Sequence, residues 1–330
     1  MDFGGRMKRR EFLGVLGGLT VCRSDTNAQP APPVIGYLST LSEAQVAPQT
    51  AAFRRGLAEV GFSEGKNVAI DFRWAEGRYE RLPAMAKELV ERPIALIVAQ
   101  APPAAIAAKA ATAAIPIIFV VGFDPVGAGL VASMNKPGGN ATGMTLVSSA
   151  LGQKRLEVIR EIVPKASVIG LLVNPLSPDT APEIASIQAG AQAMGVRLAM
   201  FNASEAREIE NAFKDIAARK PDALIVGTDP LLLNKRDDIV RLATTLKIPA
   251  IYPFRDYAVS GGLVSYGTNI ANSYRQAGIY AGRILKGDSP GELPVMQPTA
   301  FDLVINICAA AAMGIDIPAT LHARSNEAIE

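Results

Sequence analysis

Short apolar runs alternate with longer segments of helical periodicity along most of this chain. The first run, at residues 34–40, reads VIGYLST, and a segment with apolar residues at helical spacing follows it as far as Gly61. Two later runs, IALIVAQ and IPIIFVVG, are almost wholly apolar and are again separated by a helical segment. Strands buried on both faces and separated by helices predict an α/β fold with doubly wound parallel sheets.

The same series of runs occurs twice. The run VIGYLST at Val34 has a similar counterpart, VIGLLVN, at Val168. The sequence ALIV occurs at Ala95 and again at Ala223. The segment IPIIF likewise returns as IPAIY. These landmarks keep their order at an interval of about 130 residues, which indicates a duplicated lobe rather than a short structural repeat.

We therefore expect two Rossmann-like lobes joined by a three-segment hinge. The N-terminal lobe is predicted at residues 34–143 plus 269–293, and the C-terminal lobe at residues 148–267 plus 298–320. The chain would cross between the lobes near Met144, Thr268 and Gln297. Such crossings form a hinge, and the cleft between two hinged lobes is a natural ligand site.

The first 28 residues have the layout of a signal peptide. A basic head precedes an apolar run at residues 12–21, and small residues lead to Ala28. The head contains RREFL, similar to the twin-arginine export motif, and the apolar run is too short for a membrane anchor. We expect cleavage near Ala28 and a periplasmic mature protein. Lipidation at Cys22 is the alternative, although LTVC matches a lipoprotein box poorly, and Met7 is an alternative start.

Composition narrows the chemistry that the chain can perform. The 330 residues carry a formal net charge of +2, so there is no electrostatic footprint for nucleic acid. The chain has a single histidine, His322, and two cysteines. These residues are too few to favour a Ser-His-Asp triad, a Cys-His pair or a zinc site. We expect no cofactor, no metal and no catalytic residues. The segment GAGLVA at residues 127–132 matches a dinucleotide fingerprint, but its place after the fourth strand favours small-residue helix packing instead.

Ligands of doubly wound sheets lie outside the carboxyl ends of the strands. Residues at or just after the predicted strand ends, or at the crossings, are therefore the candidates for ligand binding. They are Ser39, Thr40, Gln100, Ala101, Phe123, Asp124, Thr145, Asn174, Thr228, Asp229, Tyr252, Phe254 and Tyr266.

The candidates suggest how an amino acid could be held. A helix beginning near Pro103 would direct free N–H groups and its dipole at a carboxylate. Asp124 and Asp229 each precede a proline and could bind an ammonium group, although such pairs are also typical of turns and helix caps. The aromatic candidates could stack on an apolar side chain or a sugar face, or only pack at the edge of the cleft.

Several long stretches resemble one known family. They are VIGYLST, FRRGLAEVGFSEGKNVAIDFRWAEGRYERLPAMAKEL, FDPVGAGLVASMNKPGGNATG, LVNP and SYRQAGIYAGRILKG. Together they resemble the substrate-binding proteins of ABC transporters, of the TrpX type, over essentially the whole chain after residue 33. The resemblance implies a type I periplasmic binding protein fold, closure of a ligand cleft about a hinge, and delivery of solute to an inner-membrane permease. Characterised relatives bind aromatic amino acids.

The leading hypothesis is thus a monomeric solute-binding protein of an ABC importer, with a small amino-acid-like or aromatic ligand and no enzymatic activity. The first alternative is a periplasmic ligand sensor, and the second is a two-lobed Rossmann-like enzyme. An enzyme is disfavoured because the chain has only one histidine, no paired cysteines and no credible cofactor fingerprint, and its only opposed acid–base pair would be Asp124 with Asp229.

Overall fold

The computed structural model describes residues 1–2 and 31–330. The predicted signal peptide, its cleavage near Ala28 and the alternative lipidation at Cys22 lie outside the described residues. Residues Pro32–Glu330 form one compact unit that contains two sheets, each flanked by helices.

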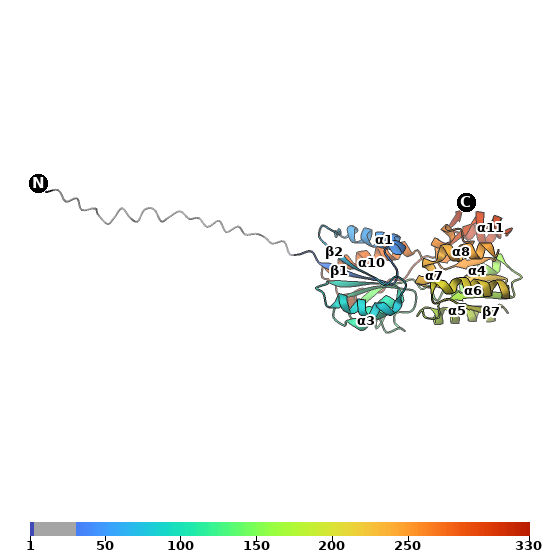
Figure 1. Cartoon of the computed structure of the whole chain (residues 1–330), viewed down its shortest axis with the longest axis horizontal. Coiled ribbons are helices and arrows are strands. Elements are labelled where there is room, and N and C mark those ends of the chain that lie inside the picture. The colour runs from blue at the N-terminus through green and yellow to red at the C-terminus, as the bar shows by residue number, and fades with distance from the viewer. Residues whose placement is uncertain (3–30) are drawn as a thin grey trace. The chain divides into compact units, whose positions relative to one another are not determined.

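The first lobe is built on a five-stranded parallel sheet in the order β2-β1-β3-β4-β5. Helices α1 and α10 contact one another on one side of this sheet, and α2 and α3 contact one another on the other (Figure 1). The elements of this lobe are β1 (Val34–Ser39), η1 (Ala44–Val46), α1 (Ala47–Glu59), β2 (Ala69–Trp74), η2 (Tyr79–Arg81), α2 (Leu82–Val90), β3 (Leu96–Gln100), α3 (Ala101–Ala111), β4 (Ile117–Val121), β5 (Ala141–Thr145), α10 (Ile270–Leu285) and η3 (Pro290–Glu292).

The second lobe repeats that order within a seven-stranded sheet, β12-β11-β10-β9-β8-β6-β7. Its run β7-β6-β8-β9-β10 corresponds strand for strand to the first sheet, as a duplication predicts; β11 then pairs antiparallel with β10, and β12 parallel with β11. The elements are α4 (Gly152–Ile162), β6 (Val168–Val173), α5 (Thr180–Ala193), β7 (Arg197–Asn202), α6 (Ala206–Arg219), β8 (Ala223–Val226), α7 (Pro230–Asn234), α8 (Arg236–Thr245), β9 (Ala250–Tyr252), α9 (Arg255–Val259), β10 (Val264–Gly267), β11 (Asp302–Asn306), α11 (Ile307–Met313), α12 (Ala319–Arg324) and β12 (Glu327–Ile329).

Three short segments connect the lobes, at residues 146–151, 268–269 and 297–301. The first two are tied to one another, because Thr268 Oγ1 donates a hydrogen bond to the carbonyl of Leu146 (2.7 Å). Met296, which directly precedes the third segment, is anchored to β5: Met296 N donates to Gly143 O and Thr145 N donates to Met296 O, both at 2.9 Å. Hydrogen bonds therefore hold two connections together and fix the start of the third beside β5.

Two local expectations were wrong. The sheet of the second lobe does not stop at residue 320, because β12 adds an edge strand, held by hydrogen bonds between Asn326 and Leu303 and by the ion pair of Arg255 with Glu327. Three residues are too few to give a strand signal in the sequence. Residues 127–132 form turns rather than a helix, so small-residue helix packing does not explain GAGLVA.

The apolar core is continuous between the lobes on one side. A single cluster of buried residues includes Tyr37 and Phe53 of the first lobe, Leu146 of the first connection, and Leu172 and Phe254 of the second lobe. Two further clusters fill the opposite faces of the two sheets. The lobes therefore meet through apolar contacts, which stabilise this arrangement by removing that surface from water.

Helices α1 and α10 cross at two glycines. A Cβ atom at Gly56 would lie 1.8 Å from the carbonyl oxygen of Arg275, and one at Gly278 would lie 2.1 Å from the carbonyl oxygen of Phe53. Backbone atoms cannot move aside as a flexible side chain can. The two helices therefore require a residue without a side chain at both positions.

Gly278→Ala should lower the free energy of unfolding by about 1–3 kcal/mol, because the new methyl forces α1 and α10 apart. Helix propensity alone would raise the free energy of unfolding by about 1 kcal/mol, because alanine favours a helix more than glycine does. A decrease can therefore be assigned to the close contact between the two helices. Chemical denaturation measures the change. The control is Gly139→Ala, whose Cβ would meet only Lys109 Nζ at 3.7 Å, and equal stability of the two variants would contradict this packing.

Candidate ligand-binding cleft

The two lobes turn equivalent strand ends toward each other. In the first lobe these are the ends of β1 and β3, and in the second the ends of β6 and β8, which flank the positions where each strand order reverses. Ligands of doubly wound sheets bind at such positions. Between them lies an inner cavity of about 50 Å³. Its lining residues are Leu41, Gln49, Gln100, Ala101, Pro102, Val120, Gly122, Leu146, Asp179, Thr228, Asp229, Pro230, Leu233, Phe254, Ile270 and Tyr274.

Gln100 and Ala101 form the end of β3 on the first-lobe side of this cavity. Ser39 Oγ donates a hydrogen bond to Gln100 Oε1 (2.5 Å), so Ser39 orients the glutamine amide. Ala101 has a φ of +70°, a conformation costly for any residue with a Cβ and commonest at functional sites. Helix α3 begins at Ala101, within two residues of the predicted start, and Pro102 and Pro103 supply no N–H donors to its first turn.

Asp229 is buried and all of its hydrogen-bond partners belong to the protein. Its Oδ1 caps α7 by accepting from the N–H groups of Leu231 (2.8 Å) and Leu232 (3.2 Å). Its Oδ2 accepts from Asn174 Nδ2 and from the hydroxyl of Tyr79 in the first lobe, both at 3.2 Å. Burial raises the pKa of Asp229, and these hydrogen bonds oppose the rise. Asp229 thus works as a helix cap and as a polar link between the lobes.

Asp179, which the sequence analysis missed, is a second buried carboxylate on this cavity. It is 1% exposed, and its Oδ1 has no hydrogen-bond partner. Burial raises the pKa of Asp179 well above its ordinary value, and the nearby acids Glu183 and Asp229 raise it further, against the opposite effect of Arg155. The carboxyl group therefore favours its protonated form when no cation is beside it.

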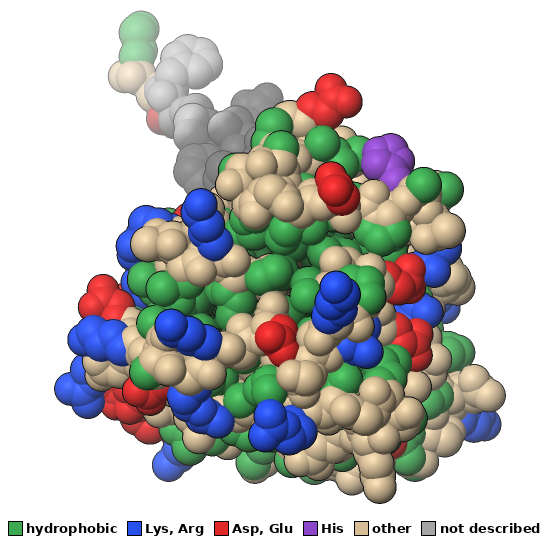
Figure 2. Space-filling model, turned by 90° about the vertical axis from the view of Figure 1, so that its right-hand side faces the viewer, with side chains coloured by type: hydrophobic (Ala, Val, Ile, Leu, Met, Phe, Trp, Pro, Cys, Tyr) green, Lys and Arg blue, Asp and Glu red, His purple; other side chains and the backbone are tan. Residues whose placement is uncertain are grey.

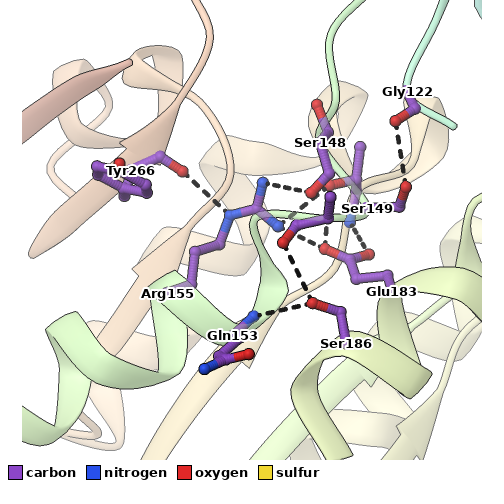
Figure 3. A network of polar contacts seen from close by, with 10 residues as sticks. Gly122, Ser148, Ser149, Gln153, Arg155, Glu183, Ser186 and Tyr266 are labelled. Atoms are coloured by element: carbon purple, nitrogen blue, oxygen red, sulfur yellow. Dashed lines mark hydrogen bonds and ion pairs between the residues drawn. The ribbon is translucent and has the colours of Figure 1, made fainter. Parts of the chain in front are cut away.

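Arg155 and Glu183 form a fully buried ion pair behind the cavity (Figure 3). Arg155 Nη1 lies 2.5 Å from Glu183 Oε1, and Glu183 Oε2 accepts from the N–H of Thr228 (2.7 Å) at the cavity wall. Burial is the largest influence on the pKa of Glu183 and raises it, while Arg155 lowers it. The pair holds the loop after β8 in place, because Thr228 bonds to Glu183 through both N–H and hydroxyl.

The same arginine also binds backbone at the connections between the lobes. Arg155 Nη2 donates to the carbonyl of Ser148 in the first connection, and Nε donates to the carbonyl of Tyr266 near the second, both at 3.0 Å (Figure 3). One side chain therefore joins two connections to the floor of the cavity.

A larger outer cavity of about 730 Å³ adjoins the inner one, and Gly122 lines both. Asp124 lines this outer cavity and is exposed, and its Oδ1 accepts a hydrogen bond from the N–H of Val126 in a turn (2.9 Å). Asp124 and Asp229 therefore line different cavities. The outer lining residues are Ile106, Gly122, Phe123, Asp124, Pro125, Gly127, Ala128, Met134, Thr145, Val147, Ser149, Ala150, Pro178, Pro182, Ser186 and Gln297.

The predicted residues thus separate into three groups. Gln100, Ala101, Thr228, Asp229 and Phe254 line the inner cavity, with Ser39 and Asn174 bonded to members of that lining. Phe123, Asp124 and Thr145 line the outer cavity. The rest line neither: Thr40 is buried in the first lobe, Tyr252 stacks on Tyr257 with ring centroids 4.7 Å apart, and Tyr266 packs beside Phe301.

The helical pattern held a signal for the buried charges. Arg155 precedes Ile159 and Ile162 at spacings of four and seven residues, which places it on the apolar stripe of α4. Glu183 precedes Ile187 and Gly190 in the same way on α5. A charge on an apolar stripe indicates a buried and paired group. Nothing comparable marks Asp179, which precedes α5 and reads as an ordinary helix cap.

Comparison with known proteins identifies the family. Residues 37–329 match the family described as ABC transporter substrate binding protein. The chain belongs to this family. It is 32% identical over 254 residues to a tyrosine-binding protein of Clostridioides difficile (strain R20291), which covers 77% of this chain and 73% of that protein. The predicted family is therefore confirmed, and its members are solute-binding proteins rather than enzymes.

Two solved structures share both fold and sequence. A Streptococcus pneumoniae ABC domain in complex with L-Trp superposes with a TM-score of 0.82 at 27% identity, covering 91% of this chain and 100% of that one. The ligand-free, open structure of a Clostridium difficile substrate binding protein with adhesive properties superposes with a TM-score of 0.63 at 26% identity. The match covers 90% of this chain and 99% of that one. The predicted type I periplasmic binding protein fold is confirmed.

Charged and apolar side chains are mixed on the molecular surface. Figure 2 shows acidic and basic side chains interspersed over one face of the molecule, with apolar side chains between them. Within residues 31–330 no helix is long and apolar enough to cross a membrane, and no group of three His, Cys, Asp or Glu side chains is arranged to hold a metal ion.

Arg155→Met should lower the free energy of unfolding by about 3–5 kcal/mol, because it leaves the Glu183 carboxylate buried without its partner. Urea denaturation measures this change. In the control Arg207→Met, an arginine that is 80% exposed loses its contact with Glu205, and the expected cost is at most about 1 kcal/mol. Equal effects of the two substitutions would contradict the structural role of Arg155.

Asp179→Asn should stabilise the protein without added solute by about 1–3 kcal/mol at neutral pH. The raised pKa of Asp179 means that the folded protein keeps a proton which the unfolded chain releases above about pH 4. Wild-type stability therefore falls as pH rises from there through the pKa of folded Asp179, and the variant lacks this loss. Urea denaturation at several pH values should show the advantage shrinking toward zero near pH 4. A variant less stable than wild type at pH 7 would contradict the claim that buried Asp179 destabilises the folded protein at neutral pH.

Proposed function

We propose that this chain is the periplasmic solute-binding component of an ABC importer, and that it holds an amino acid between its lobes by hinge closure. The observation that carries the proposal is the inner cavity, which takes polar side chains from the strand ends of both lobes and apolar side chains such as Phe254 and Leu41. A zwitterion with an apolar or aromatic side chain needs both kinds of wall.

The size of the inner cavity supports closure. About 50 Å³ is well below the roughly 300–1,000 Å³ of typical small-molecule sites, so the lobes must separate to admit an amino acid. The structure superposes better on the L-Trp complex from Streptococcus pneumoniae than on the open, ligand-free Clostridium difficile protein, at nearly equal identity. Both facts fit an arrangement near the closed end of a hinge motion.

The named ligands of two relatives support the ligand class. One relative is called a tyrosine-binding protein, and another is solved with L-Trp. We therefore propose an aromatic amino acid as the solute of this chain, with Phe254 and Tyr274 beside its ring. Export through the twin-arginine-like signal and delivery to an inner-membrane permease complete the proposal, with the binding protein acting as a monomer.

L-tyrosine or L-tryptophan should raise the thermal unfolding midpoint. A ligand bound only by the folded form at 100 times its Kd adds about 2.7 kcal/mol, which is several degrees for a protein of this size. Differential scanning fluorimetry with both amino acids, and with ribose and glucose as controls, measures the shift. A shift with a sugar alone, or with none of these solutes, would contradict the proposed ligand class.

A further inference from the structure

Asp179 occupies a capping position without acting as a cap. It directly precedes α5, where aspartate normally accepts hydrogen bonds from the first N–H groups of a helix. Its side chain makes no such bond, and its φ of −73° and ψ of −22° are helical rather than the extended values of a cap. The carboxylate lies instead on the wall of the inner cavity, against Gly122 of the first lobe.

No side chain of the described protein neutralises this carboxylate. Arg155 is the one buried arginine or lysine among residues 31–330, and its nearest partner is Glu183. The other acid in contact with the cavity, Asp229, would repel a charge on Asp179. An isolated buried carboxylate is among the most unfavourable groups that a protein can hold. A cationic group of a ligand bound in the cavity would neutralise this carboxylate.

The opposite wall supplies a second acceptor. Gln49, on α1 of the first lobe, lines the same cavity and is 6% exposed, and its Oε1 has no hydrogen-bond partner. Two unpartnered oxygens on opposite lobes match a ligand group with several donors and no acceptor. A protonated amine has three N–H donors and a positive charge, whereas a hydroxyl has one donor and no charge.

We infer that Asp179 binds the protonated amine of the solute, assisted by Gln49 from the other lobe, and that this pairing makes an amine a requirement for tight binding. The inference rests on the proposed function, because it assigns a role within the same cleft. It gives the ammonium role to a residue other than Asp124 and Asp229, whose carboxylates are engaged by a turn and by a helix cap.

The pairing requires close approach at Gly122. A Cβ atom there would lie 2.8 Å from Asp179 Oδ2 and 3.1 Å from its Oδ1. Any side chain at this position would displace the carboxylate or hold the lobes apart. The absence of a side chain at Gly122, directly after β4, is therefore part of the arrangement that presents Asp179.

Binding should then release a proton. The groups that face Asp179 are Glu183 on its own helix, Asp229 after β8 and Arg155 on α4, with Tyr79 bonded to Asp229. Burial raises the pKa of Asp179 most, Glu183 and Asp229 raise it further and Arg155 opposes them, so the carboxyl group favours its protonated form until a cation arrives. When the amine binds, the carboxylic acid becomes a carboxylate paired with the ammonium, and its proton passes to solvent. Affinity should therefore increase with pH up to the pKa of Asp179 in the free protein, stay level above it, and fall once the amine loses its proton.

Isothermal titration calorimetry tests the inference with two solutes, L-tyrosine and 3-(4-hydroxyphenyl)propionate, which lacks the amine. The variants are Asp179→Asn and the control Asp215→Asn, an exposed residue on α6. We expect Asp179→Asn to weaken L-tyrosine binding by about 100-fold, and the control to change it by less than about threefold. The analogue should bind wild type about 100-fold more weakly than L-tyrosine, with a much smaller difference in Asp179→Asn.

Titrations in two buffers of different ionisation enthalpy measure the number of protons released on binding. A variant that is merely misfolded or destabilised would not change this number selectively. Wild type should release a proton on binding L-tyrosine, and Asp179→Asn should not. If wild type binds L-tyrosine and Asp179→Asn binds it equally well, the inference is overturned while the proposed function stands. If wild type binds the analogue as tightly as L-tyrosine, the amine requirement is overturned. If wild type binds neither L-tyrosine nor L-tryptophan, the proposed ligand class falls and the inference with it.

Discussion

The balance of buried charge between the lobes is the constraint on which the site depends. Three carboxylates, Asp179, Glu183 and Asp229, lie buried together with one arginine among the described residues. Glu183 is neutralised by Arg155, and Asp229 is satisfied by four hydrogen bonds, one of them from the opposite lobe. Only Asp179 is left without a partner. The unpartnered carboxyl group of Asp179 therefore lies on the cavity wall, at the position where we infer that a cationic group of the solute binds.

Duplication explains the scaffold but not this charge distribution. Both lobes use the same strand order, and the strand pairs β1 with β3 and β6 with β8 present their ends to one cavity. The first lobe ends these strands in neutral groups such as Gln100, whereas the second carries Asp229 and, in the loop before α5, Asp179. Two lobes of similar fold that carry different side chains at their strand ends form an asymmetric cleft, which suits a solute whose two ends differ.

Hydrophobic periodicity was sufficient to predict the lobes, their duplication and the strand ends that face the cavity, because burial on both faces leaves a clear pattern. It could not separate Phe254, which lines the cavity, from Tyr252 and Tyr266, which do not, since all three lie within two residues of a strand end and only side-chain direction distinguishes them. Asp179 was missed for another reason. It reaches the cavity through a loop folded back on Asn174, where Ser177 N and Thr180 Oγ1 donate to the Asn174 carbonyl. The six irregular residues 174–179 carry no periodic signal.

A crystal structure of the protein with L-tyrosine tests the central claim most directly. The account predicts the amine nitrogen within about 3 Å of an Asp179 carboxylate oxygen, with Gln49 on its other side and the ring toward Phe254 and Tyr274. A tyrosine bound with its amine in the outer cavity beside Asp124, or with its own carboxylate against Asp179, would contradict the account.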